Sequence, residues 1–103
     1  MKILLACAGG MSSSIVAEAI IDEAKNQGQE EIVIDPTGTE SVEEDLKKND
    51  YDLILLAPQV AYRKSYIDNL AEENGITVLP IKETEYNPMA APKLYQQMKD
   101  SLN

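Results

Sequence analysis

Two short apolar runs constrain the fold of this chain more than any other feature. Residues 2–6 (KILLA) and residues 53–57 (LILLA) are almost entirely apolar and do not alternate with polar residues. Strands of this kind are covered on both faces, which is typical of a parallel sheet packed between helices. Two further strands are predicted at residues 31–34 (EIVI) and 76–81 (ITVLPI). The first of these ends where residues 36–38 (PTG) break the pattern.

A helical pattern follows each of the first two strands in the chain. The first helix is predicted over residues 12–27, and Gly28 ends it. Its apolar face is expected to consist of Ile15, Val16, Ala19, Ile20 and Ala24. Ser41 and Glu44 match a capping box, which predicts a second helix that runs to about Asn49.

The last third of the chain carries two more helices around the fourth strand. Ile67, Leu70 and Ala71 mark the first of them, and Asn74-Gly75 closes it. Pro80 places the fourth strand near its end or at a sheet edge. The final helix is marked by Leu94, Tyr95, Met98 and Leu102. Asn87-Pro88 resembles its cap, but Pro92 favours a regular start only near Ala91. Met89 and Met98 are expected in the core.

These elements predict a single α/β domain that spans residues 1–103. Strands that alternate with helices favour a four-stranded parallel sheet in the order 2-1-3-4, flanked by helices. This is a flavodoxin-like topology, also found in low-molecular-weight phosphatases. In such sheets ligands bind at the carboxyl ends of the strands, beside the point where the strand order reverses. Residues 7–14 and 58–63 are predicted to meet there.

The loop after the first strand has the composition of an anion-binding site. Cys7, the only cysteine, is followed by Gly9 and Gly10 and then by serines at 12–14. The first N–H groups of the following helix have no partner within the helix and point into this loop. Together with the glycines and the serine hydroxyls, they favour a bound phosphate. The same positive helix end favours a thiolate at Cys7.

The loop holds an anion with neutral groups only, because residues 3–17 carry no charged side chain. It therefore has no arginine to clamp a phosphoryl group and no acid to protonate a leaving group. A lone cysteine is often just a packing residue. The position of Cys7 before two glycines and three serines, at the reversal of strand order, favours a functional thiol instead.

The composition excludes several other classes of protein. A formal net charge of −9 argues against nucleic acid and against an anionic membrane surface as partners. With no histidine and one cysteine, a Cys/His zinc site is excluded, and we expect no metal and no cofactor. The first apolar run is too short for a signal peptide or a membrane span. One cysteine fits a reducing cytoplasm.

Two segments of the chain resemble one known family. "ILLACAGGMSSS" at 3–14 and "LILLAPQVAY" at 53–62 are similar to the cysteine loop and the Pro-Gln segment of a bacterial family. This family is the IIB component of the phosphoenolpyruvate-dependent sugar phosphotransferase system (PTS), in its lactose and cellobiose (also chitobiose) branch. The resemblance covers the whole chain. The sequence departs from the family pattern at Ala57, where glycine is frequent, and at Arg63.

The resemblance implies roles for particular residues. Cys7 would become a phosphocysteine. The loop that cradles its phosphate would be formed by Ala8, Gly9, Gly10, Met11, Ser12, Ser13 and Ser14. Pro58, Gln59 and Tyr62 would be neighbours of this loop, although Gln59 and Tyr62 could equally be ordinary surface residues.

The resemblance further implies a phosphotransferase with two protein partners. Cys7 would receive its phosphoryl group from a phosphohistidine of the IIA component. It would pass the group to a sugar held by the membrane-embedded IIC component, such as cellobiose or another β-glucoside disaccharide, lactose or chitobiose. The protein would be cytoplasmic and recruited to the membrane through IIC, without inserting into the bilayer itself.

The main alternative is a low-molecular-weight phosphatase-like cysteine hydrolase. Its loop needs an arginine six residues after the cysteine, where this chain has Ser13, and an acid before a late proline, where this chain has Asn87. An arsenate reductase on this scaffold needs more cysteines, and a carrier of FMN needs more aromatic residues. A response-regulator receiver needs acidic residues where Cys7 and Pro58 stand.

Overall fold

Four parallel strands form the central sheet in the order β2-β1-β3-β4, as the sequence predicts. The computed structural model describes residues 1–8 and 11–102. Its strands are β1 (Lys2–Cys7), β2 (Val33–Gly38), β3 (Leu53–Leu56) and β4 (Thr77–Pro80). The two uninterrupted apolar runs, β1 and β3, occupy the two central positions of the sheet, where both faces are covered.

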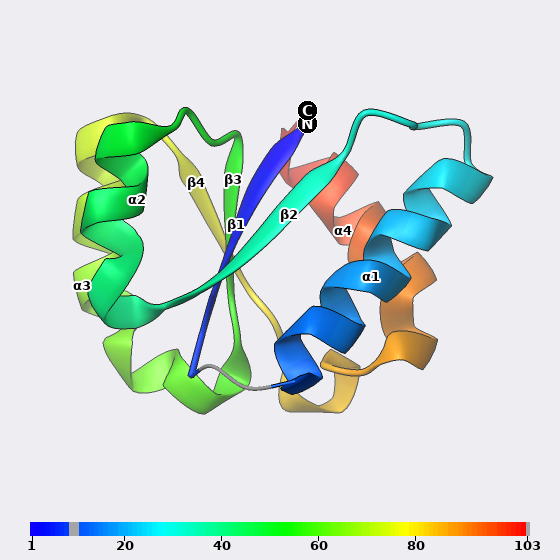
Figure 1. The fold of residues 1–103 in the computed structure, drawn as a ribbon. Coiled ribbons are helices and arrows are strands. Elements are labelled where there is room, and N and C mark those ends of the chain that lie inside the picture. The colour runs from blue at the N-terminus through cyan, green and yellow to red at the C-terminus, as the bar shows by residue number, and fades with distance from the viewer. Residues whose placement is uncertain (9–10, 103) are drawn as a thin grey trace.

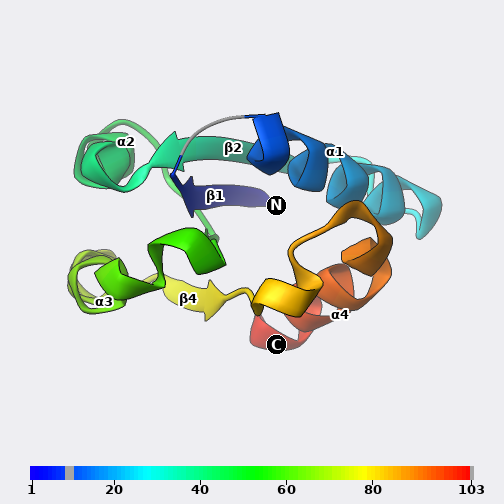
Figure 2. The same cartoon turned by 90° about the horizontal axis from the view of Figure 1, so that it is seen from below.

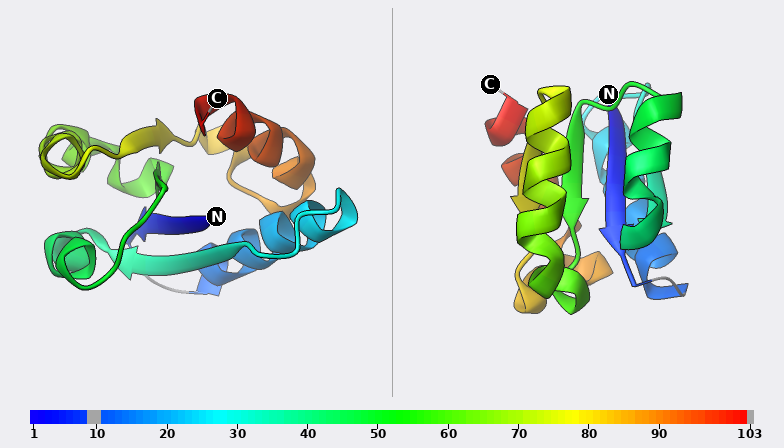
Figure 3. Two further views of the ribbon diagram at one scale, coloured as in Figure 1. Left: turned by 90° about the horizontal axis from the view of Figure 1, so that it is seen from above. Right: turned by 90° about the vertical axis from the view of Figure 1, so that its left-hand side faces the viewer.

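Helices cover both faces of this sheet and make a three-layer α/β/α arrangement (Figure 1). The helices are α1 (Met11–Asn26), α2 (Val42–Lys48), α3 (Lys64–Asn74) and α4 (Ala91–Leu102). Helices α1 and α4 pack on one face, and α2 and α3 lie side by side on the other (Figure 3). Among the described residues, no helix is both long enough and apolar enough to cross a bilayer.

Side-chain alternation along the central strands divides the core into two halves. Ile3, Leu5, Leu53 and Leu55 pack toward α1 and α4, in one buried cluster. Leu4, Ala6, Ile54 and Leu56 pack toward α2 and α3, in the other. Burial of each Leu or Ile contributes about 1.5–3 kcal/mol, so these two strands make the largest contribution to holding the layers together.

The second strand differs from the prediction. The sequence predicts residues 31–34, with a break at 36–38, but β2 spans Val33–Gly38 and includes an exposed proline, Pro36. The prediction was wrong because β2 lies at an edge of the sheet. A proline, which has no N–H to donate, is tolerated on an edge strand. As a result Thr37 and Gly38 continue the ladder beside the end of β1.

Helix ends confirm two predictions and contradict one. Gly75 closes α3 in the left-handed conformation, with φ of 67°. The side chain of Asn87 accepts a hydrogen bond from the Ala90 N–H at 3.1 Å, and α4 begins directly afterwards. The predicted capping box is wrong, because Ser41 makes no side-chain cap and is itself the last residue of a 3₁₀ turn. The ends of the other elements lie within one residue of the prediction.

Three apolar residues are more exposed than the sequence predicts. Ile15 is 48% exposed, because the buried side of α1 is formed by Ser13, Val16, Ala17, Ile20 and Ala24. Met89 is 92% exposed, because it lies on a 3₁₀ turn before α4 rather than on the packed face of that helix. Leu102, in the last turn of α4, is partly exposed. Met98, in contrast, is fully buried as predicted.

Candidate functional site

The carboxyl ends of the strands bring together three segments that are distant in the sequence (Figure 2). Cys7 is the last residue of β1. A 3₁₀ segment, Pro58–Arg63, follows β3 and contacts β1, the strand that ends at Cys7. The third segment, residues 81–90, follows β4 and leads into α4. The site described below is this end of the sheet.

The thiol of Cys7 is turned into the protein. The residue is 3% exposed and lies opposite Gly38 in the β1–β2 ladder. Its Sγ donates a hydrogen bond to the backbone carbonyl oxygen of Thr37 at 3.3 Å. A thiolate has no proton to donate, so this contact belongs to the protonated thiol.

The residues after Cys7 lead directly into helix α1. Ala8 is exposed, and α1 begins at Met11, so Cys7 comes shortly before the amino-terminal end of this helix in the chain. Gly9 and Gly10, predicted to be part of the cradle, lie outside the described residues. The backbone of Met11 and Ser12 is helical. The first turn of α1 carries no acidic residue that would oppose an anion at this end.

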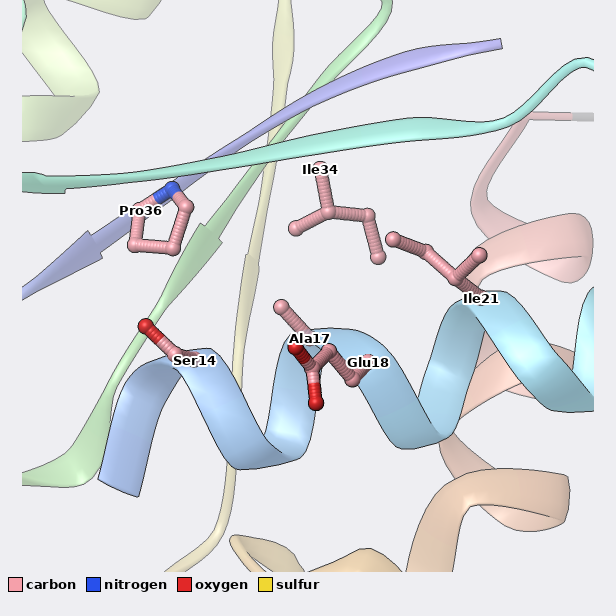
Figure 4. A pocket seen from close by; sticks show the side chains of 6 residues that line it. All are labelled: Ser14, Ala17, Glu18, Ile21, Ile34 and Pro36. Atoms are coloured by element: carbon pink, nitrogen blue, oxygen red, sulfur yellow. The ribbon is translucent and has the colours of Figure 1, made fainter. Parts of the chain in front are cut away.

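The structure separates the next two serines of the predicted cradle. Ser13 is 2% exposed and faces the interior. Ser14 is exposed and lines a groove of about 180 Å³ between α1 and β2 (Figure 4). The groove is otherwise lined by Ala17, Glu18, Ile21, Ile34 and Pro36. Of these two serine side chains, only that of Ser13 is enclosed by the protein.

The predicted neighbours of the loop lie on the segment after β3. Val60 is buried and anchors this segment, whereas Gln59 and Tyr62 are exposed, Tyr62 by 81%. Pro58 and Gln59 line a hollow of about 140 Å³ together with Glu83 from the segment after β4. Gln59 and Tyr62 are therefore available to a partner at this end of the protein, and no hydrogen bond of either side chain is seen within the described residues.

Sequence analysis missed one residue of this site, Tyr86. It lies between two 3₁₀ turns, is half-buried, and packs against the buried cluster that contains Cys7. Burial, followed by negative charge at Cys7, raises the pKa of Tyr86. The sequence offers one signal for it: the loop after the fourth strand of a parallel sheet ends at the same edge as Cys7.

The groups gathered here suit covalent chemistry on an anion. Cys7 offers a thiol, the first turn of α1 has backbone N–H groups without partners in the helix, and Tyr86, which packs against the cluster that contains Cys7, adds a neutral hydroxyl group. Among residues 1–8 and 11–102, no group of His, Cys, Asp and Glu side chains is arranged to hold a metal ion. Neutral donors can hold a phosphoryl group on sulfur without an acid to assist its hydrolysis.

Comparison of sequences places the chain among transport proteins. An oligo-β-mannoside-specific EIIB component of the PTS from Bacillus subtilis (strain 168) is 34% identical over 96 residues, which cover 93% of this chain and 90% of that protein. A cellobiose-specific EIIB component from Lactococcus lactis subsp. lactis (strain IL1403) is 30% identical over 104 residues, covering 98% of this chain and 95% of the relative. PTS EIIB components act as phosphotransferases.

Solved structures and a family model agree with these relatives. The lactose-specific IIB domain from Streptococcus pneumoniae superposes with a TM-score of 0.84 at 27% identity, covering 100% of this chain and 98% of that domain. The cellobiose-specific IIB protein from Borrelia burgdorferi gives 0.77 at 28% identity, covering 100% and 92%. The model of the PTS lactose/cellobiose-specific IIB subunit matches residues 2–97. The fold, the related sequences and the family model all identify the same family, and the match covers nearly the whole chain. This protein therefore belongs to the lactose/cellobiose-specific IIB family of the sugar phosphotransferase system.

Proposed function

We propose that Cys7 carries the phosphoryl group, and that the chain acts as a single carrier domain over residues 1–103. Cys7 accepts the group from a phosphohistidine of a IIA protein and passes it to a sugar held by a membrane IIC protein. The observation that supports this best is the position of Cys7, the only thiol of the chain, at the end of β1 and just before the start of α1. A helix start favours both a bound phosphate and a reactive thiol.

Each of the two transfers is a balanced displacement at phosphorus. In the first, Sγ of Cys7 attacks the phosphorus, the N–P bond of the phosphohistidine breaks, and the thiol proton ends on the departing imidazole. In the second, a sugar hydroxyl attacks the same phosphorus, the S–P bond breaks, and the hydroxyl proton returns to the sulfur. Covalent catalysis divides one transfer into two in this way. The protein then contributes mainly by positioning the group and stabilising its charge.

Before the first transfer the thiol has to leave its resting contact. The Thr37 carbonyl oxygen lies 3.3 Å from Sγ and accepts its hydrogen bond. A phosphorylated sulfur has no proton to donate, and its negative oxygens would be repelled by this carbonyl. We therefore assign the phosphoryl group to the side of the sulfur away from Thr37, toward the start of α1.

Around the thiol, the exposed side chains suit contact with protein partners. Tyr62 and Met89, 81% and 92% exposed, are carried by the segments that follow β3 and β4. Tyrosine and methionine are enriched in the cores of protein interfaces. Pro58, Gln59 and Tyr62 are assigned to this contact rather than to the chemistry. Because the IIC partner is embedded in the membrane, we assign the carrier to the cytoplasmic side of that membrane.

We infer the substrate class from the names of the relatives and not from this chain's own residues. The relatives are named for oligo-β-mannosides, cellobiose and galactose. We assign the same broad class to this carrier, a β-linked disaccharide such as cellobiose or chitobiose, or lactose. In this proposal the IIC protein contains the sugar-binding cavity, and this chain supplies the phosphoryl group.

The proposal is tested by loading the protein and locating the phosphate. The protein is incubated with phosphorylated IIA proteins of the lactose and cellobiose type, digested under mildly alkaline conditions and analysed by mass spectrometry. One phosphoryl group is expected, on the peptide that contains Cys7, and none on the Cys7→Ser variant. Phosphate on a serine, or no loading by any of these donors, would contradict the proposal.

A further inference from the structure

The end of strand β2 connects the thiol of Cys7 with helix α2. The backbone carbonyl oxygen of Thr37 accepts the hydrogen bond from the Cys7 Sγ at 3.3 Å, and the side-chain hydroxyl of Thr37 donates to the Asp45 carboxylate at 2.6 Å. Asp45 lies in α2, the helix to which β2 leads (Figure 1). Thr37 therefore contacts the thiol through its backbone and α2 through its side chain.

The hydrogen bond between Thr37 and Asp45 is the stronger of these two contacts. A distance of 2.6 Å between the two oxygen atoms is typical of a hydroxyl that donates to an ionised carboxylate, and such bonds are about twice as strong as those between neutral groups. A thiol, in contrast, is a weak donor. Both Thr37 and Asp45 are half-buried, which strengthens the bond relative to one in open water. The stronger contact thus fixes the residue that accepts the weaker one.

Helix α2 gives this contact a firm support. Only the 3₁₀ turn Thr39–Ser41 separates β2 from α2, so the strand end and the helix are close in the chain as well as in space. Val42 and Leu46 of α2 are buried in the same cluster as Cys7. The helix that carries Asp45 is therefore held by its own packing, and the Asp45 carboxylate does not depend on Thr37 for its position.

The contact with Thr37 keeps the sulfur of Cys7 turned into the protein. Cys7 is 3% exposed in this orientation, so a reagent or a partner protein reaches the sulfur only when the contact opens. Whatever fixes the Thr37 carbonyl oxygen therefore also affects how often the thiol becomes available.

We propose that Thr37 and Asp45 are positioning residues for Cys7: the Asp45 carboxylate holds Thr37, and the Thr37 carbonyl oxygen in turn holds the thiol in its inward orientation until the phosphoryl donor arrives. This inference rests on the proposed function, because it takes Cys7 as the reacting group. It predicts that removal of the Thr37 hydroxyl, which is hydrogen-bonded to Asp45, makes the thiol more reactive.

The test breaks the bond between Thr37 and Asp45 and leaves the Thr37 carbonyl group in place. Thr37→Val removes the hydroxyl and keeps the branched shape, whereas Thr37→Ser keeps the hydroxyl. Asp45→Ala removes the acceptor, whereas Asp45→Asn keeps an acceptor oxygen without the charge. Cys7 is the only cysteine of the chain. Its alkylation by iodoacetamide at a fixed pH and the S–H stretching band of the Raman spectrum therefore each report on this residue alone.

A matched control removes a different hydrogen bond from the same strand. The hydroxyl of Tyr51 donates to the carboxylate of Asp35 in β2 at 2.8 Å, two residues before Thr37. Tyr51→Phe removes this bond and leaves the contact between Thr37 and Asp45. Thermal unfolding of every variant measures the loss of stability. If a less stable fold were enough to expose the thiol, the control would be alkylated faster as well.

Loss of one hydrogen bond corresponds to alkylation that is about 2- to 10-fold faster. We expect this for Thr37→Val and Asp45→Ala, and rates close to that of the unaltered protein for Thr37→Ser, Asp45→Asn and Tyr51→Phe. The double variant Thr37→Val/Asp45→Ala should react no faster than the faster single variant. The S–H band should move to higher frequency in Thr37→Val, because a weaker hydrogen bond leaves the S–H bond stiffer, and it should stay in place in Tyr51→Phe.

Three results would overturn the inference: an unchanged alkylation rate and S–H band in Thr37→Val, no recovery in Thr37→Ser, or an equal acceleration in Tyr51→Phe. Failure of the unaltered protein to accept phosphate at Cys7 is a different result, which refutes the proposed function. The two cases are separable because alkylation and the Raman spectrum need no phosphoryl donor, so they report how Thr37 and Asp45 hold the thiol whether or not the thiol is phosphorylated.

Discussion

The Sγ atom of Cys7 and the carbonyl oxygen of Thr37 are joined by a hydrogen bond of 3.3 Å across the last rung of the β1–β2 ladder. The contact exists because β2 continues through Pro36 to Gly38, which keeps Thr37 beside the end of β1. The thiol is therefore hydrogen-bonded to an edge strand of the sheet. Since sulfhydryl groups are weak donors, the contact orients the thiol more than it stabilises the fold.

This contact predicts that Cys7 can be replaced without unfolding the protein. Cys7→Ala removes a buried sulfur and a weak hydrogen bond at the end of a strand, so the free energy of unfolding should fall by about 1–2 kcal/mol. Cys7→Ser retains a hydrogen-bond donor for Thr37, so its free energy of unfolding should lie between those of the unaltered protein and Cys7→Ala. Urea unfolding measures both. Cooperative unfolding together with complete loss of phosphate uptake is expected, whereas an Ala variant that still accepts phosphate would rule out Cys7 as the acceptor.

A second prediction separates a carrier from a phosphatase. Ser13 stands where a phosphatase loop has its arginine, and Ser13 is buried. An arginine that stabilises phosphoryl transfer contributes roughly 10³-fold or more, and a general acid about 10²- to 10⁴-fold. We expect p-nitrophenyl phosphate to be hydrolysed no faster by the protein than by its Cys7→Ser variant. Rapid turnover that disappears in Cys7→Ser would instead establish the hydrolase.

The ion pair between Glu85, in the segment after β4, and Lys93 of α4 predicts that the stability of the fold depends on pH. The pKa of Glu85 is lowered from 4.5, first by its hydrogen bond to Lys93 and further by Gln97 and Lys82, whereas burial raises it. A carboxyl group with a lowered pKa stabilises the fold above its unfolded pKa, and this contribution is lost as the pH falls through the folded pKa. The Glu85 contribution is therefore present above pH 4.5 and is lost progressively as the pH falls from 4.5 through the lowered pKa.

Thermal unfolding of Glu85→Gln measures this contribution. The variant should unfold at a lower temperature than the unaltered protein near neutral pH, and the difference should close in acid below the Glu85 pKa. The matched control is Glu44→Gln, in which the lost partner is Lys48, 3.0 Å away on the exposed surface of α2. Exposed pairs of this kind contribute little, so the control should change the unfolding temperature less. A difference for Glu85→Gln that persists unchanged in acid would contradict the assignment.

A fourth prediction concerns the end of α3. Gly75 has φ of 67°, and nothing surrounds the position that a Cβ would occupy. The cost of a side chain here is therefore conformational rather than steric, about 1–2 kcal/mol for alanine. Asparagine tolerates this conformation better. In urea unfolding Gly75→Ala should be less stable than Gly75→Asn, and the opposite order would show that the backbone can readjust.

The central strands could be predicted from the sequence because burial on both faces leaves a direct mark, as in the apolar runs of β1 and β3. The edge strand could not. Pro36 looks like a break unless it is known that β2 has a neighbour on one side only. The predictions that Ile15 and Met89 are buried were wrong for a related reason. An apolar side chain is assigned to a core by its type, but its exposure depends on what packs against it.

In the candidate site, too, the sequence predicts what is local and misses what depends on tertiary packing. Cys7 and the helix that follows it are contiguous in the sequence, so their relationship is local and predictable. Tyr86 reaches the buried cluster that contains Cys7 only through the folding of the whole sheet. No motif surrounds it, and its position depends on Glu85 and Asn87, which hold the short segment in place.

The start of β1 and the last turn of α4 lie at the amino ends of the strands, opposite the site (Figure 1). The Met1 ammonium group donates to the Glu31 carbonyl oxygen at 2.8 Å, and Lys99 near the end of α4 donates to Gln27, just after α1, at 2.9 Å. The protein can therefore carry a fluorophore or be tethered to a sensor surface at either end while its working end stays open. Docking of a partner becomes measurable by a reporter that does not compete with it.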